Sequence, residues 1–119
     1  MNNLAYSQQT YLQSDISQQL NSLADRLDRI ATICNNADDL SSALELVRES
    51  QYFIEWTAPN LSIDDAAILV DLGRILAAWK YQWTEISSNP ASVLKVSNLA
   101  QSWHKRLCTE FAIHERSIN

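Results

Sequence analysis

Residues that form tight turns are scarce in this sequence. It contains one glycine and two prolines among 119 residues. Tight β-hairpins depend on glycine, with asparagine or aspartate beside it, so the composition argues against a sheet of short strands. Valine, isoleucine and threonine, which favour strands, are also spread thinly along the chain. We therefore expect an all-helical protein.

Long apolar runs are missing as well. No window approaches the roughly 18 consecutive apolar residues that a membrane span needs. The start, MNNLAYSQQ, has neither the basic residues nor the apolar core of a secretory signal. Two cysteines, Cys34 and Cys108, are too few for a disulfide-rich scaffold and fit a reducing compartment. We expect a cytoplasmic protein with no membrane contact and no disulfide.

Positive charge is in short supply. Fourteen acidic residues outnumber nine basic ones and leave a formal net charge of -5. Because a phosphate backbone attracts dense positive charge, nucleic acid is not an expected partner. The charges are uneven: residues 36–71 hold eight acids and one base, while residues 72–119 hold six bases and three acids. Neighbouring helices of opposite sign explain this pattern, and self-association through complementary faces is the alternative.

Apolar residues recur at steps of three and four, which is typical of amphipathic helices. The pattern predicts four helices, at residues 9–34, 39–56, 63–87 and 90–115. Short connections between them favour neighbours that run in opposite directions. We therefore expect one domain over residues 1–119, an antiparallel up-down four-helix bundle. Residues 1–8 have little to bury and are the stretch expected to fray.

The third predicted helix is apolar over an unusually wide arc. Placed at about 100° per residue, its apolar side chains cover roughly 220°, about twice the arc of a helix with one covered face. One side is bulky and includes Trp79 and Trp83, whereas the other side carries small residues. We therefore expect this helix to be the most buried, with a neighbour against each side. The small side consists of Ala66, Val70, Gly73 and Ala77.

Two polar residues fall on predicted inward faces. Lys80 lies between Trp79 and Trp83, and His104 follows Trp103. A lysine that extends to solvent at the helix end and a core histidine bonded to a backbone carbonyl or to a polar side chain are the structural interpretations. The alternative is a pocket walled by the three tryptophans, in which Lys80 or His104 binds an anionic ligand.

Signatures of catalysis are absent. The sequence has no phosphate-binding glycine loop and no nucleophile elbow. Its paired acids, such as Asp64 and Asp65, are better explained as helix starts than as acid–base pairs. His104 and Cys108 are four residues apart, but two ligands do not complete a metal site. We expect no enzymatic activity, no cofactor and no metal.

The second predicted helix carries apolar residues outside its core stripe, namely Leu46, Tyr52, Phe53 and Trp56. Large apolar groups outside a core are typical of protein interfaces. A side contact with the third helix is the alternative for Leu46 and Phe53. We expect a small non-catalytic interaction or regulatory bundle that self-associates through this helix. A ligand-binding sensor, with the pocket of Trp79, Lys80, Trp83, Trp103 and His104, is the alternative function.

Overall fold

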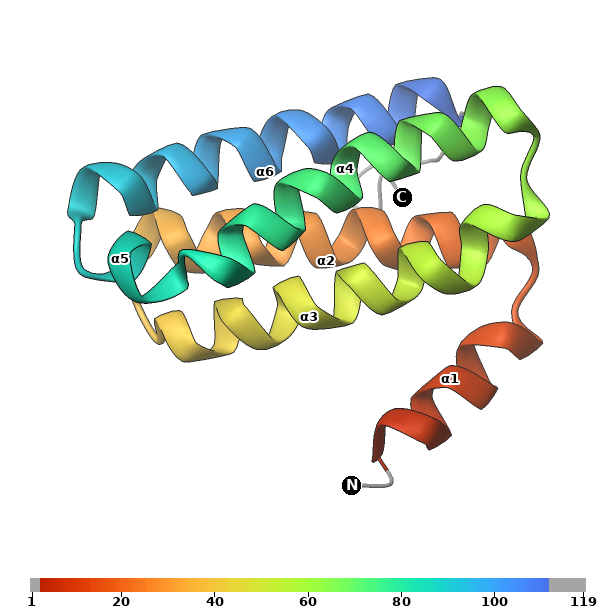
Figure 1. Cartoon of the computed structure of the whole chain (residues 1–119), viewed down its shortest axis with the longest axis horizontal. Helices are drawn as coiled ribbons and strands as arrows, with labels where there is room; N and C mark the ends of the chain where they lie inside the picture. Colours follow the sequence, from red (N-terminus) through yellow and green to blue (C-terminus); the bar gives the residue numbers. More distant parts are fainter. Residues whose placement is uncertain (1–2, 112–119) are drawn as a thin grey trace, which may run out of the picture.

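A computed structural model of the chain describes residues 3–111, with side chains from residue 8 onward. All regular structure in this part of the chain is helical, which confirms the predicted class. Four long helices pack against each other, and successive ones run in opposite directions (Figure 1). The long helices are α2 (Ile16–Asn36), α3 (Leu40–Thr57), α4 (Ile63–Tyr81) and α6 (Pro90–Glu110). The short ones are α1 (Asn3–Gln13), η1 (Ala58–Asn60) and α5 (Trp83–Ser87).

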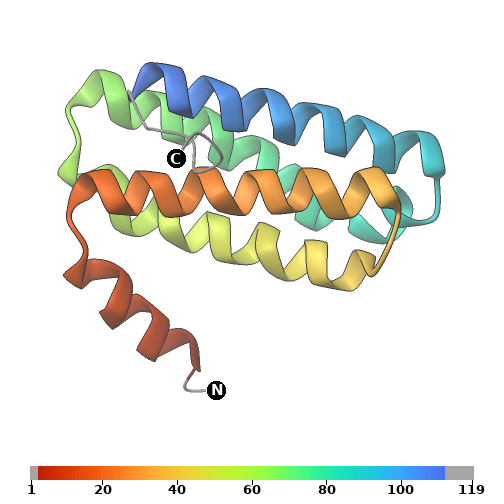
Figure 2. The same cartoon turned by 180° about the vertical axis from the view of Figure 1, so that it is seen from behind.

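The prediction of one continuous helix over residues 9–34 is wrong. α1 ends at Gln13 and α2 starts at Ile16, because Asp15 caps the new helix. The Asp15 carboxylate accepts a hydrogen bond from the backbone N–H of Gln18 at 2.8 Å, and the Gln18 side chain accepts one from the Asp15 N–H at 3.1 Å. This reciprocal capping box stabilises a fresh helix start. α1 consequently points away from the long helices (Figure 2), and residues 3–8 belong to it.

The other predicted boundaries agree better. α3 lies within one residue of the predicted 39–56, and α4 begins after Ser62, whose hydroxyl accepts the Asp65 N–H at 3.2 Å. The predicted helix 63–87 is nevertheless interrupted at Gln82, where α4 ends and α5 follows. α6 begins at Pro90, directly after its cap, and ends at Glu110. Residues 112–115 of the predicted fourth helix lie outside the described part.

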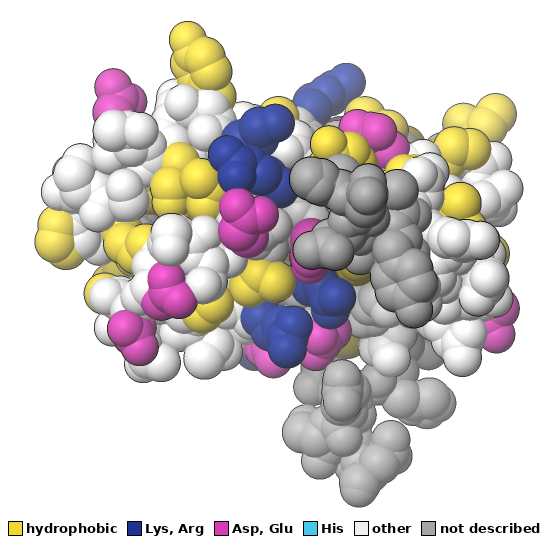
Figure 3. Space-filling view, turned by 90° about the horizontal axis from the view of Figure 1, so that it is seen from below, with side chains coloured by type: hydrophobic (Ala, Val, Ile, Leu, Met, Phe, Trp, Pro, Cys, Tyr) yellow, Lys and Arg dark blue, Asp and Glu magenta, His cyan; other side chains and the backbone are white. Residues whose placement is uncertain are grey.

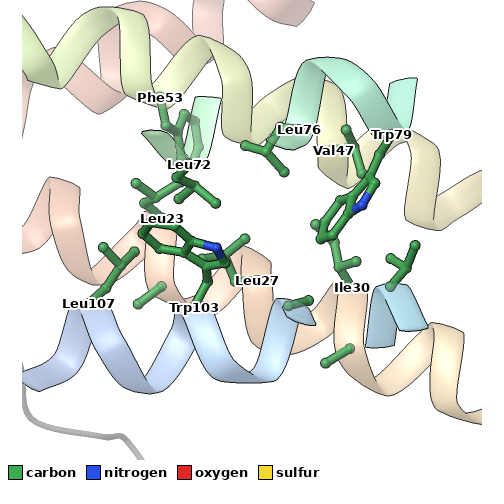
Figure 4. Packing of buried hydrophobic residues seen from close by; sticks show 14 of the residues in the cluster. Leu23, Leu27, Ile30, Val47, Phe53, Leu72, Leu76, Trp79, Trp103 and Leu107 are labelled. Carbon is green, nitrogen blue, oxygen red and sulfur yellow. The ribbon is translucent and has the colours of Figure 1, made fainter. Parts of the chain in front are cut away.

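α2 contributes most to the core. Eight of its residues are buried, whereas the predicted third helix has six, four on α4 and two on α5. The prediction that the third helix is the most buried is therefore wrong. α2 packs along both α6 and α3, and its residues Leu23, Leu27 and Ile30 face side chains of the other helices (Figure 4). α4 has helical neighbours on one side only, so the small side of its apolar arc stays partly or largely exposed.

Candidate functional site

The four candidate interface residues of α3 differ in their exposure. Phe53 is buried, at 6% exposed, under the ring of Tyr11 from α1, with 4.1 Å between the two ring centroids. Trp56 is half-buried beside the same tyrosine, and Tyr52 is 38% exposed and stacks on Trp56 at 5.6 Å. Leu46 is half-buried and lies elsewhere on α3. Three of the four therefore form one aromatic cluster that α1 partly covers.

Tyr11 is also held by a buried polar network. Its hydroxyl contacts the carbonyl oxygen of Gln19 at 3.1 Å and the hydroxyl of Thr57. The Thr57 hydroxyl donates to Gln19 Oε1 at 3.1 Å, and Gln19 Nε2 donates to the Ser14 carbonyl at 2.9 Å. Burial raises the pKa of Tyr11 to about 12, against the smaller opposing effect of the Thr57 hydrogen bond. The network joins α1, α2 and α3 at one point.

A groove of about 470 Å³ runs between α2 and α3 and includes Leu46. Leu46 and Ile33 supply its apolar part, and charged groups of both signs together with two hydroxyl side chains supply the remainder. The guanidinium of Arg26, just outside it, pairs with the Glu49 carboxylate of the groove at 2.8 Å and joins the two helices. Figure 3, seen from the α3 side, shows basic side chains in the middle of this face with acidic ones beside them. The full lining consists of Arg29, Thr32, Ile33, Ser42, Glu45, Leu46 and Glu49.

The three tryptophans of the candidate pocket are all buried, with at most 7% of each exposed. Figure 4 shows Trp79 beside Val47 and Ile30, and Trp103 at a separate place in the core, near Leu23 and Leu107. Trp83 belongs to α5, beyond the break that follows α4.

Lys80 and His104 do not meet in one cavity either. Lys80 is exposed in the last turn of α4. His104 is half-buried, and its Nδ1 hydrogen-bonds to the backbone carbonyl of Ala24 on α2 at 2.8 Å. The bond is of the kind that the structural interpretation of His104 expects, although the ring is half-buried and does not belong to the buried core. Its Nε2 lies 3.9 Å from the sulfur of Cys108, one turn farther along α6.

A second cavity, of about 400 Å³, lies at the end of the molecule where α2 meets α3 and α5 meets α6. Cys34 lines it from α2, but this thiol is 2% exposed. Burial raises the pKa of Cys34 to about 11, which disfavours the reactive thiolate. None of the five candidate pocket residues lines this cavity or the α2–α3 groove. The remaining lining residues are Asn35, Ala37, Leu40, Ser87, Ser88, Pro90, Val93 and Leu94.

Within residues 3–111, no group of three or more His, Cys, Asp or Glu side chains is placed to hold a metal ion. Nor does any helix in this range combine the length and apolar character of a membrane span. Comparison of the chain with protein-family models, with curated proteins and with solved structures finds no match in any of the three.

The cluster of Tyr11, Gln19 and Thr57 was not predicted from the sequence. Tyr11 and Thr57 are 46 residues apart, so no local pattern connects them. The start of α2 did leave a signal. Asp15 followed by Gln18 three residues later is a capping-box pattern, and it could have placed the break between α1 and α2.

Proposed function

We propose that this chain is an antiparallel four-helix bundle whose role is non-catalytic protein interaction, and that it self-associates through α3. The observation that carries the proposal is the α2–α3 groove, in which Leu46 is surrounded by charged groups of both signs. The long helices, packed against each other and joined by short connections, support the bundle architecture.

The charges of the groove suit a second copy of the same chain. A twofold contact brings one surface against itself, so that surface must be self-complementary. The groove offers the Arg29 cation together with the carboxylates of Glu45 and Glu49, and rotation about a twofold axis can bring opposite charges together. Tyr52 and Trp56 add accessible apolar surface elsewhere on α3.

The two cysteine thiols support a reducing cellular compartment. Cys34 and Cys108 are both within the core, at 2% and 9% exposed. Protein thiols persist where glutathione and thioredoxin keep them reduced. We therefore extend the proposal to a cytoplasmic location.

Light scattering coupled to size-exclusion chromatography tests the proposed function, from about 10 μM to about 1 mM, the range in which weak interfaces associate. We expect the wild-type mass to rise above that of the monomer with concentration. Leu46→Lys should weaken the association at least about tenfold, because it replaces an apolar side chain of the contact by a cation that loses its hydration there.

Leu99→Lys is the matched control, since Leu99 is 41% exposed on α6, outside the groove. It should leave the mass profile unchanged. A wild-type chain that stays monomeric over the whole concentration range contradicts self-association. A Leu46→Lys variant that associates as the wild type does contradicts the α3 contact.

A further inference from the structure

α4 carries a row of exposed apolar side chains along its solvent side. Ile63 is 88% exposed, Val70 44% and Tyr81 90%, and Ala67 and Ala77 between them are exposed too. At about 100° per residue, these positions fall within about 40° of one line along the helix. The row therefore spans α4 from its first residue to its last, and the exposed Arg74 lies among its members near the middle. We name it the α4 row: Ile63, Ala67, Val70, Ala77 and Tyr81.

No helix of the described residues covers the α4 row. α4 lies across the front of the other long helices in Figure 1, and its outward side is open. Its opposite side carries the buried residues of the helix, among them Leu72 and Leu76. A helix that is apolar on both sides is normally buried on both sides, so α4 lacks a neighbour.

We propose that a second copy of this chain covers the α4 row, with its own α4 running antiparallel. Reversal about the middle of α4 places Ile63 level with Tyr81 of the other copy, and Ala67 level with Ala77. Large apolar side chains then meet near both ends of the contact. Alanines face each other between them, where small side chains let two helix axes approach to about 8–10 Å.

The charges along α4 favour this antiparallel arrangement. Antiparallel helices have opposed macrodipoles, which favours this direction over the parallel one. Near the middle, Arg74 pairs with Asp71 at 3.6 Å, and both are largely exposed, so reversal brings each arginine near the aspartate of the other copy.

The size of the row sets the strength of the contact. The 19 residues of α4 form a cylinder about 28 Å long. Two such faces bury on the order of 1,000 Å², the lower end of specific interfaces and the range of weak, reversible ones. We expect a dissociation constant on the order of 100 μM.

This contact goes beyond the proposed self-association through α3. The α4 row shares no residue with the α2–α3 groove. One chain with two different twofold contacts forms assemblies larger than a dimer, whereas the loss of either contact leaves dimers. The two proposals can therefore fail separately.

Disulfide crosslinking of single-cysteine variants tests the geometry. Ala67→Cys and Ala77→Cys chains, one carrying a mass tag, are mixed and oxidised. Level positions of an antiparallel pair lie within the roughly 7 Å between Cα atoms that a disulfide requires, whereas two copies of residue 67 lie about 15 Å apart along the axis. We expect the mixed product to exceed either same-variant product at least about tenfold.

The wild-type chain and Ser102→Cys are the crosslinking controls. Cys34 and Cys108 are buried and should crosslink little, and Ser102 is exposed on α6, away from α4. Same-variant products that match or exceed the mixed product overturn the antiparallel contact. Mixed crosslinking no faster than that of Ser102→Cys overturns the contact altogether.

Association measurements of charge variants give a second readout. Val70→Lys places a cation level with Arg74 of the other copy and should weaken the self-association at least about tenfold, with the helical signal unchanged because Val70 is already 44% exposed. Leu99→Lys is the matched control on α6. Unchanged association of Val70→Lys, together with weakened association of Leu46→Lys, overturns the α4 contact and supports the α3 contact. The reverse result supports α4 and contradicts α3.

Discussion

Replacing Tyr11 with phenylalanine is expected to remove much of the sensitivity of this protein to alkaline pH. Burial raises the pKa of Tyr11 from 10.0 to about 12 in the folded state. Between these two values the unfolded chain loses the phenol proton while the folded chain keeps it. The unfolded state therefore binds fewer protons, and the free energy of unfolding falls as the pH rises. The contribution of Tyr11 is complete below a pH of about 10 and is lost as the pH approaches about 12.

The size of this loss follows from the shift. A difference of about 2 pKa units corresponds to about 2.7 kcal/mol of unfolding free energy. Cys34 adds a comparable loss that begins lower, since burial raises its pKa from 9.0 to about 11. Wild-type protein should thus lose on the order of 5 kcal/mol between a pH of about 8 and about 12, a large part of the 5–15 kcal/mol that is typical of domains. Tyr11→Phe should keep only the part that belongs to Cys34.

Urea unfolding at a series of pH values measures these free energies. At neutral pH, Tyr11→Phe should cost about 1 kcal/mol, because it removes the hydrogen bonds of the phenol to Gln19 and Thr57. Ultraviolet absorbance of tyrosinate, recorded while the protein is still folded, should show a phenol that ionises late in the wild type and not in the variant. An equal loss of free energy with pH in both proteins would contradict a raised pKa of Tyr11. Coincident absorbance titrations of the two proteins would contradict it as well.

Leu27→Ala removes a side chain that is fully buried on α2, and it should lower the free energy of unfolding in urea by about 2–5 kcal/mol. Leu99→Ala, at a 41% exposed position, should change this free energy by less than about 0.5 kcal/mol. Equal losses in the two variants would contradict the burial of Leu27. Asn89→Ala removes the carbonyl that caps α6, which accepts the Ala91 N–H at 3.0 Å, and should cost about 1 kcal/mol. The loss at Asn89 should be recovered in part by Asn89→Ser, which caps again, and no recovery would argue against capping.

Helix starts could be predicted from the sequence because their causes are local. Ser62 with Asp65 marks the start of α4, and Asn89 with Pro90 marks that of α6. Apolar spacing alone gave the wrong result between α1 and α2. Leu12 and Ile16 are four residues apart, as if on one continuous stripe, yet Leu12 is 46% exposed on α1. The spacing of apolar residues contains no signal for a change in the direction of the chain.

Tertiary features were harder to anticipate for a related reason. The spacing of its apolar residues shows that α4 is apolar on both sides. It does not predict how many other helices pack against α4. Phe53 lies outside the predicted core stripe of its helix. It is nevertheless buried, because the ring of Tyr11 on α1 covers it. A backbone carbonyl could be anticipated as a partner of His104, because a ring nitrogen that is removed from water requires a hydrogen bond.

The packing of α2 against α6 has a consequence for how the chain folds. α6 begins more than fifty residues after α2 ends, so one of the main contacts of the core closes a long loop of chain. Contacts between distant segments slow folding relative to contacts between neighbours. During synthesis, α2 and α3 leave the ribosome well before α6. Until then, the apolar stripe of α2 lacks one of its two long partners, and it is exposed to chaperones and to other nascent chains.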